Sequence, residues 1–183
     1  MTVLTLNEEH TGIVIVDVQT KLMAVMRHRE RVIDNIIKLL HLSKLFTLPV
    51  ILTEQYPKML GSTIKEVKEN LPSYDPIQKM VFDCCQVEYF KNCLESGGVT
   101  TIILAGVESH ICVFQTCVSL LERGFNVHVP QDAVDSRTEE NWRVGLELMK
   151  KAGAVITSTE TIIFQILKIA GTEEFKKMLK IIK

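Results

Sequence analysis

The stretch TIILAGVESHIC, residues 101–112, carries the pattern that decides the fold. Its first half is almost entirely apolar rather than alternating, which is typical of a strand buried on both faces of a sheet. Gly106 permits a tight reversal after this strand, and an apolar helical pattern follows. Five other short runs of the same kind lie at 13–17, 50–53, 80–82, 127–129 and 155–157. Six such runs separated by helical stretches predict a doubly wound α/β fold with a six-stranded parallel sheet.

The segments between these runs have the periodicity of amphipathic helices. We expect helices around 31–40, over 111–121 and over 139–151. Gly124 and Gly153 are the expected stops of the last two. The longest irregular stretch, residues 56–76, is predicted to cover an active site. Because no repeat, low-complexity tract or flexible linker divides the chain, we predict a single domain over residues 1–183.

The composition excludes several classes of protein. The chain has 183 residues with 21 Lys+Arg against 22 Asp+Glu, and this near-neutral charge does not favour binding to nucleic acid or an anionic membrane. The apolar runs are much shorter than the roughly 18 residues of a spanning helix, so no membrane association is expected. The five cysteines have no framework spacing, and no basic leader precedes the first apolar run. These features predict a cytoplasmic protein.

Two candidate catalytic residues lie where predicted strands end, which is where ligands bind in a parallel sheet. Asp17 closes the first apolar run, and its alternative role is that of a turn or helix cap. Cys112 falls in the first turn of a helix, where free backbone N–H groups favour the thiolate and could bind an oxyanion. We therefore expect a lowered pKa for Cys112. The alternative is a small residue packed in the core.

Lys79 begins an apolar run and could stabilise both a thiolate and the Asp17 carboxylate. The remaining cysteines are interpreted as core or background residues: Cys84, Cys85, Cys93 and Cys117. The histidines show no metal-ligand spacing, and the glycines form no phosphate-binding loop. We therefore expect neither a metal nor a cofactor.

Several short motifs together resemble the isochorismatase-like cysteine hydrolases, and in particular the isochorismatase domain-containing proteins. The motifs are VDVQ at 16–19, TEQYP at 53–57, KMVF at 79–82, GVESHICV at 106–113, QT at 115–116 and DAVDSR at 132–137. The similarity is colinear from about Asn7 to the end of the chain. It implies a three-layer α/β/α fold.

The resemblance also implies roles for individual residues. Asp17, Lys79 and Cys112 match a catalytic triad in which the aspartate is the general base, the lysine holds the ion pair and the cysteine is the nucleophile. A cis peptide bond between Val107 and Glu108 is implied, with the N–H groups of Glu108 and Cys112 forming an oxyanion hole. Nicotinamidases of this superfamily carry a metal-binding Asp-x-His pair where this chain has Glu54-Gln55-Tyr56, so no metal is expected. The cysteine favours acyl transfer over vinyl ether hydrolysis.

The leading hypothesis is a metal-independent cysteine hydrolase of a small amide or related C–N bond, acting through a thioester-like intermediate. Gln19, Tyr56 and His110 are candidate pocket residues, although each could be structural. The alternatives are an isochorismatase-type hydrolase, a thiol redox sensor centred on Cys112, and a non-catalytic oligomeric scaffold. The apolar C-terminal residues predict a homo-oligomer or, alternatively, a core helix: Ile162, Ile163, Phe164, Ile166, Leu167 and Ile169.

Overall fold

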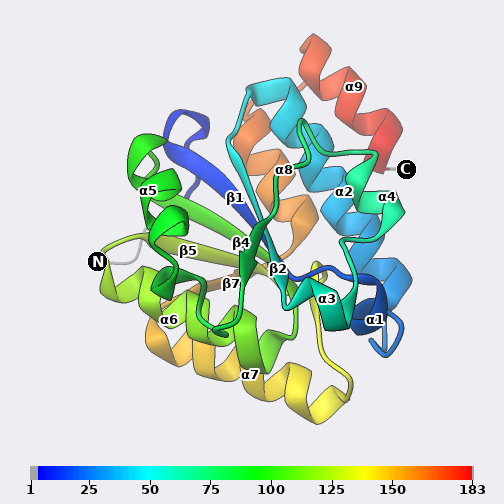
Figure 1. Ribbon diagram of the computed structural model, residues 1–183. Coiled ribbons are helices and arrows are strands. Elements are labelled where there is room, and N and C mark those ends of the chain that lie inside the picture. The colour runs from blue at the N-terminus through cyan, green and yellow to red at the C-terminus, as the bar shows by residue number, and fades with distance from the viewer. Residues whose placement is uncertain (1–3, 183) are drawn as a thin grey trace.

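The computed structural model describes residues 4–182 and contains one parallel sheet (Figure 1). The strands follow the order β3-β2-β1-β4-β5-β7, and the short strand β6 pairs with β4 beyond the end of β5. Their bounds are β1 Thr11–Val16, β2 Val50–Gln55, β3 Ile77–Lys79, β4 Thr101–Val107, β5 Asn126–Pro130, β6 Val134–Asp135 and β7 Val155–Thr157. The predicted doubly wound α/β fold is therefore confirmed, with β6 as an additional short strand.

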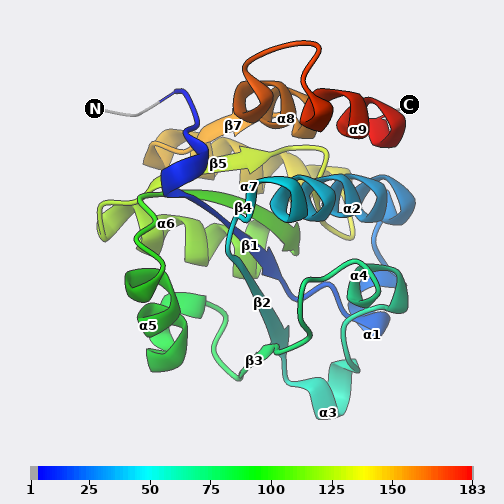
Figure 2. The same cartoon turned by 90° about the horizontal axis from the view of Figure 1, so that it is seen from above.

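Helices cover both faces of the sheet, so the molecule has three layers (Figures 1 and 2). Helices α2, α8 and α9 lie on one side, and α5, α6 and α7 lie on the other. The bounds are α1 Thr20–Met23, α2 Arg29–Phe46, α3 Pro57–Leu60, α4 Lys65–Lys68, α5 Glu88–Ser96, α6 Phe114–Glu122, α7 Glu139–Ala152, α8 Thr159–Leu167 and α9 Glu173–Ile182. Within residues 4–182, no helix is both long enough and apolar enough to cross a bilayer.

The central strand β1 shows how the sheet builds two cores. Ile13 and Ile15 face the layer of α2 and α8, whereas Val14 and Val16 face the layer of α5 and α6. Successive side chains of a strand point to opposite faces, so an apolar strand without alternation supplies both layers at once. This arrangement places the end of β1 deep inside the molecule.

The helix ends follow local chemistry that is readable in the sequence. The Thr138 side chain accepts a hydrogen bond from Asn141 N at the start of α7, and Ser158 does the same for Thr161 N at the start of α8. Gly153 ends α7 in a left-handed conformation. The helix predicted to begin at residue 111 instead opens with a π-helical turn, Ser109–Val113, before α6.

One predicted strand was wrong in position. The edge strand is Ile77–Lys79 rather than 80–82, because Ile77 and Lys79 are buried whereas Met80 and Phe82 are exposed. The apolar triplet after Lys79 therefore lies on the surface. Lys79 ends β3 instead of beginning a strand, which brings its side chain to the carboxyl edge of the sheet.

The apolar residues of α8 are used mainly inside the chain. Ile162, Ile163, Ile166 and Leu167 are buried in the core between α8, α2 and the sheet. Phe164 is half-exposed and makes an edge-to-face contact with the Phe175 ring of α9, at 6.3 Å between centroids. The core-helix alternative thus accounts for the hydrophobicity that had suggested a subunit contact, apart from Phe164 and the exposed Ile169.

Candidate active site

Asp17 directly follows β1 and is completely buried. Its φ of 52° lies in the left-handed region, which Asp and Asn tolerate better than most residues. One carboxylate oxygen accepts a hydrogen bond from Thr53 Oγ1 at 2.8 Å, and the other accepts one from Lys79 Nζ at 2.6 Å. Both side chains of the Lys79–Asp17 ion pair have zero exposure, so the site contains a fully desolvated charge pair.

Lys79 reaches this carboxylate from the edge strand β3, and neighbouring acceptors hold its ammonium group. Gln55 Oε1 accepts a hydrogen bond at 2.7 Å, and the carbonyl oxygens of Val81 and Phe82 accept weaker ones at 3.3 and 3.4 Å. Burial by itself lowers the pKa of Lys79, but Asp17, Cys84 and Cys112 outweigh it, so the pKa lies above its ordinary value. The amine is therefore positively charged at neutral pH.

Cys112 lies in the π-helical turn that follows β4, and only 6% of the residue is exposed. Its thiol interacts electrostatically with the Asp17 carboxylate. Burial raises the pKa of Cys112 and the negative charge of Asp17 raises it further, while Lys79 acts in the opposite direction. The expected lowering of this pKa was wrong. The resting group is therefore a neutral thiol.

A raised pKa gives Cys112 a distinctive alkylation profile. Because only the thiolate reacts, we expect the rate constant with iodoacetamide to rise about tenfold per pH unit throughout the range from neutral pH to pH 10. The rate is measured by mass spectrometry of the Cys112 peptide, with protein unfolded in urea as the control. The unfolded control should level off above about pH 8.5, the ordinary thiol pKa. A plateau below pH 8 in the folded protein would contradict the raised pKa.

Glu108 lies at the turn between β4 and Cys112, and the peptide bond that precedes it is cis, the isomer implied by the resemblance. Its carboxylate accepts hydrogen bonds from Arg137 N at 3.2 Å and Arg137 Nε at 3.0 Å. Its carbonyl oxygen accepts hydrogen bonds from Ile111 N and Val113 N. The side chain and the carbonyl of Glu108 are thus both used to hold the turn that carries Cys112.

The other wall of this turn is a network of small polar side chains. Ser136 Oγ lies 2.6 Å from Ser109 Oγ and 3.0 Å from His110 Nδ1. Burial lowers the pKa of His110, with Glu108 opposing and Arg137 adding to the effect, so the imidazole is neutral at pH 7. Of the three candidate pocket residues, His110 is therefore the one that the structure brings next to Cys112 in the same turn.

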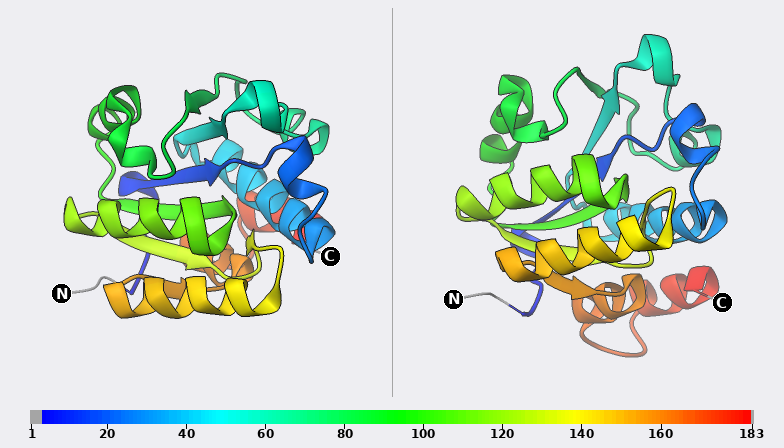
Figure 3. Two further views of the ribbon diagram at one scale, coloured as in Figure 1. Left: turned by 60° about the horizontal axis from the view of Figure 1, so that its bottom comes forward. Right: turned by 90° about the horizontal axis from the view of Figure 1, so that it is seen from below.

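Helix α7 presses directly on this turn, as its position beside α6 in Figure 3 indicates. A Cβ atom added at Gly145 would lie 2.7 Å from the carbonyl carbon and oxygen of Ser109 and 2.9 Å from His110 N. Such distances are far below normal van der Waals contact. Only glycine allows α7 to support the backbone of the site so closely.

Gln19 and Tyr56 have structural contacts. The Gln19 side chain is fully buried and bonds to the main chain at Gln55 N, Gln55 O and Gly61 O. It therefore ties β2 to Gly61, and both the nitrogen and the oxygen of its amide have main-chain partners. Tyr56 has a left-handed φ of 36°, its N–H bonds to Lys79 O, and 40% of the residue is exposed.

Two residues at the site, Thr53 and Gln55, have contacts that the sequence patterns did not predict, whereas Cys84 is buried as predicted. Thr53 and Gln55 hold the two members of the ion pair, because β2 lies between β1 and β3. Cys84 is fully buried with its sulfur 3.9 Å from Thr53 Oγ1, and its pKa of about 11 is raised mainly by burial. In the sequence, the only indication that Thr53 and Gln55 belong to the site was their place in the motif at 53–57.

Glu54, which the sequence comparison set against the metal-binding pair of nicotinamidases, has protein partners for its carboxylate. Its Oε1 accepts hydrogen bonds from Thr63 N at 2.6 Å, Thr63 Oγ1 at 2.7 Å and Tyr74 OH at 2.7 Å. Within residues 4–182, no group of three or more His, Cys, Asp or Glu side chains is arranged to hold a metal ion. Through these contacts, Glu54 anchors Thr63 and Tyr74 of the stretch 56–76 to β2.

The fold is that of the isochorismatase-like hydrolases, and comparisons with known proteins agree over nearly the whole chain. The isochorismatase domain family model matches residues 11–161. The secreted isochorismatase effector Isc1 of Phytophthora sojae is 37% identical over 95% of this chain and 85% of its own length. The chain therefore belongs to the isochorismatase family, and the family fits the role of a hydrolase.

Two solved structures illustrate the likeness in three dimensions. The MAR1 ribonuclease of Caenorhabditis elegans is 34% identical with a TM-score of 0.91, covering 97% of this chain and 92% of that one. The YcaC protein of Escherichia coli, an octameric hydrolase of unknown specificity, is 23% identical with a TM-score of 0.92. The match to YcaC covers 99% of this chain and 92% of that one, and it supports the fold.

Proposed function

We propose that the protein is a metal-independent cysteine hydrolase of small amides or related C–N bonds, with Asp17, Lys79 and Cys112 as its catalytic residues. The observation that carries this proposal is the buried ion pair between Lys79 and Asp17, together with the buried Cys112 thiol whose pKa that carboxylate raises. Burying two charges is costly, and burying them next to a nucleophile is typical of a site built for proton transfer.

The first half of the reaction forms a thioester. Cys112 Sγ attacks the carbonyl carbon of the substrate while Asp17 takes the thiol proton, so a neutral thiol is converted to a nucleophile only as the new bond forms. The negative charge that develops on the carbonyl oxygen is stabilised by the backbone N–H groups of Glu108 and Cys112. The protonated Asp17 then gives its proton to the departing amine, and the C–N bond breaks.

The second half regenerates the enzyme. Asp17, again a carboxylate, takes a proton from a water molecule as the water oxygen attacks the thioester carbon. The C–S bond breaks, the acid leaves, and the sulfur recovers the proton from Asp17. Lys79 remains an ammonium ion throughout, and its contacts with Gln55 and two carbonyl oxygens support this role. Its ammonium group stays paired with the Asp17 side chain, 2.6 Å away.

The proposal is tested with p-nitrophenyl acetate, a general acylating probe. We expect a burst of p-nitrophenol and a mass increase of one acetyl group on the peptide that contains Cys112. Both are absent in Cys112→Ala and retained in Cys85→Ala, because Cys85 is a buried cysteine outside the site. Acetylation of a different residue, or a burst that survives in Cys112→Ala, would refute the assignment of the nucleophile.

The cellular setting and the assembly belong to the same proposal. All five cysteines are free, including four buried ones, which supports a reducing compartment and hence the cytoplasm. Phe164 and Ile169 are exposed apolar residues at the C-terminal region and support a homo-oligomeric contact there.

A further inference from the structure

On the side away from β1, strand β2 has a neighbouring strand along only half of its length. Residues Val50, Ile51 and Leu52 pair with Ile13, Val14 and Ile15 of β1. On the opposite side, β3 pairs with Thr53–Gln55 and extends no further. Among residues 4–182, no strand therefore lies beside Val50–Leu52 on the side away from β1. An uncovered edge of this kind offers main-chain groups to another extended chain.

The directions of the backbone groups follow from the neighbouring hydrogen bonds. Pro49 O and Thr53 O accept hydrogen bonds from Ile13 N and Asp17 N, so these odd-numbered positions face β1. Tyr56 N, at an even-numbered position, bonds to Lys79 O on the other side. Because backbone groups alternate between the two edges of a strand, the N–H and C=O groups of Val50 point into the uncovered space.

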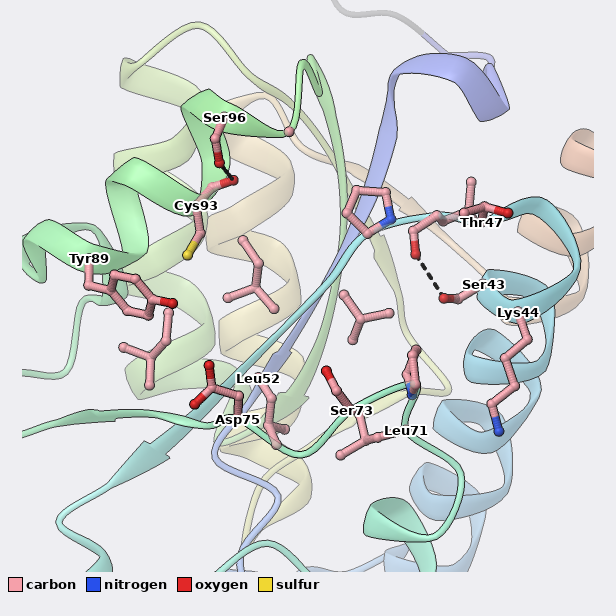
Figure 4. A pocket seen from close by; sticks show the side chains of 17 residues that line it. Ser43, Lys44, Thr47, Leu52, Leu71, Ser73, Asp75, Tyr89, Cys93 and Ser96 are labelled. Atoms are coloured by element: carbon pink, nitrogen blue, oxygen red, sulfur yellow. Dashed lines mark hydrogen bonds between the residues drawn. The ribbon is translucent and has the colours of Figure 1, made fainter.

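A cavity of about 670 Å³ lies along this uncovered edge (Figure 4). Its walls come from both helix layers, with Ser43 and Lys44 of α2 on one side and Tyr89 and Cys93 of α5 on the other. The segment from Leu71 to Asp75 lines its lower border in this view. We call this cavity the edge slot. It occupies the position that a further strand of the sheet would take between the two layers.

The side chains of Val50, Ile51 and Leu52 alternate between the two helix layers, as expected for a strand. Val50 and Leu52 pack with the core on the α2 side, whereas Ile51 packs with the core on the α5 side. An extended chain in the slot would likewise send successive side chains to the two layers. Two charged side chains of opposite sign also line the slot, Lys44 of α2 and Asp75 of the segment before β3.

We propose that the edge slot binds an extended peptide segment, which joins the sheet as a strand beside Val50–Leu52. A hydrocarbon ligand would fill the apolar floor but would leave the main-chain groups of Val50 without partners, which is costly. The uncovered stretch of β2 is three residues long, about 10 Å at strand spacing, which matches the length of a short extended segment. A flexible peptide satisfies both requirements. This proposal is independent of the hydrolase assignment.

The test uses acetyl-Thr-Val-Thr-Val-Thr-amide as the probe with the wild-type protein. We expect amide NMR shifts centred on Val50 and Leu52, and amide hydrogen exchange at Val50 at least tenfold slower with saturating peptide. The same peptide with alternate amides N-methylated should bind at least tenfold more weakly, because it has lost its donors. Equal binding of the methylated peptide or of decanol, or no shift up to peptide concentrations of about 5 mM, would overturn the proposal.

Two further measurements make the result independent of any single substitution. Val50→Pro removes the N–H donor at the first residue of the strand, where proline is tolerated, and should weaken binding about fivefold relative to Val50→Thr. In the wild-type protein, bound peptide should slow alkylation of Cys93 by N-ethylmaleimide at least threefold, since Cys93 faces the slot. Unchanged alkylation of Cys93 at saturation would place the peptide elsewhere and refute the proposal.

Discussion

Asp17→Asn should reduce turnover of p-nitrophenyl acetate by about 10³- to 10⁴-fold while leaving the backbone of the site intact. Asparagine tolerates the left-handed φ of 52° found here, so the substitution removes the base without imposing a new strain. The amide can accept a hydrogen bond from Thr53 or Lys79, but it cannot take the proton of Cys112.

The same variant should show a second, opposite effect. Because the Asp17 carboxylate raises the pKa of Cys112, its removal lowers that pKa and makes iodoacetamide alkylation at pH 7 faster. Slower hydrolysis combined with faster alkylation is a signature that simple misfolding does not produce. If both rates fall together, or if turnover stays within tenfold of wild type, Asp17 is not the base.

The stability of this variant needs its own control. Asp17→Asn leaves Lys79 buried without a counter-ion, which costs about 3–5 kcal/mol of unfolding free energy. The double variant Asp17→Asn with Lys79→Met removes both charges and should recover part of that loss while remaining inactive. Asp34→Asn changes an exposed carboxylate of α2 and should alter neither activity nor urea stability.

Gly106→Ala should destabilise the fold by more than about 4 kcal/mol, the range reserved for severe steric defects. A Cβ atom at this position would lie 2.1 Å from Val16 O and 2.6 Å from Val16 N in the adjacent strand β1. The φ of 117° is also one that alanine rarely adopts. Both neighbours are backbone at the centre of the sheet, so neither can move aside.

Gly98→Ala is the matched control for this prediction. Gly98 also has a positive φ, 61°, but no heavy atom lies within 4 Å of an added Cβ. Its substitution should cost only the backbone strain, about 1 kcal/mol. The two variants are compared by urea unfolding, or by soluble yield if Gly106→Ala does not accumulate. Similar unfolding free energies would show that the approach of β1 and β4 is not what requires glycine.

The strand ends were the predictable part of the site. Asp17 and Cys112 follow apolar runs, and because parallel strands β1 and β4 are adjacent, their ends lie together. The position of the edge strand was not predictable from hydrophobicity, since Met80–Phe82 is apolar yet exposed while the true strand contains Gln78 and Lys79. The contacts of Thr53 and Gln55 depend on the register of β2 and β3, which no local pattern specifies.

The pKa of Cys112 shows where a correct local rule gave a wrong conclusion. A helix start favours the thiolate by roughly 0.3–1 kcal/mol at exposed positions. Loss of solvation and a carboxylate within hydrogen-bond reach act on a larger scale, and both favour the protonated thiol. The position of a cysteine in the chain predicted the first effect, but the other two depend on tertiary burial and on Asp17.

A sulfur that stays protonated until a carbonyl group arrives is also a sulfur that peroxide attacks slowly. Oxidation to sulfenic acid, like alkylation, needs the thiolate, so the protonated Cys112 should react slowly with oxidants. The contact between Cys112 and Asp17 thereby separates two reactivities that a preformed thiolate would combine. Under the proposed mechanism, Cys112 would then act as a nucleophile toward a bound carbonyl group and react slowly with small electrophiles in solution.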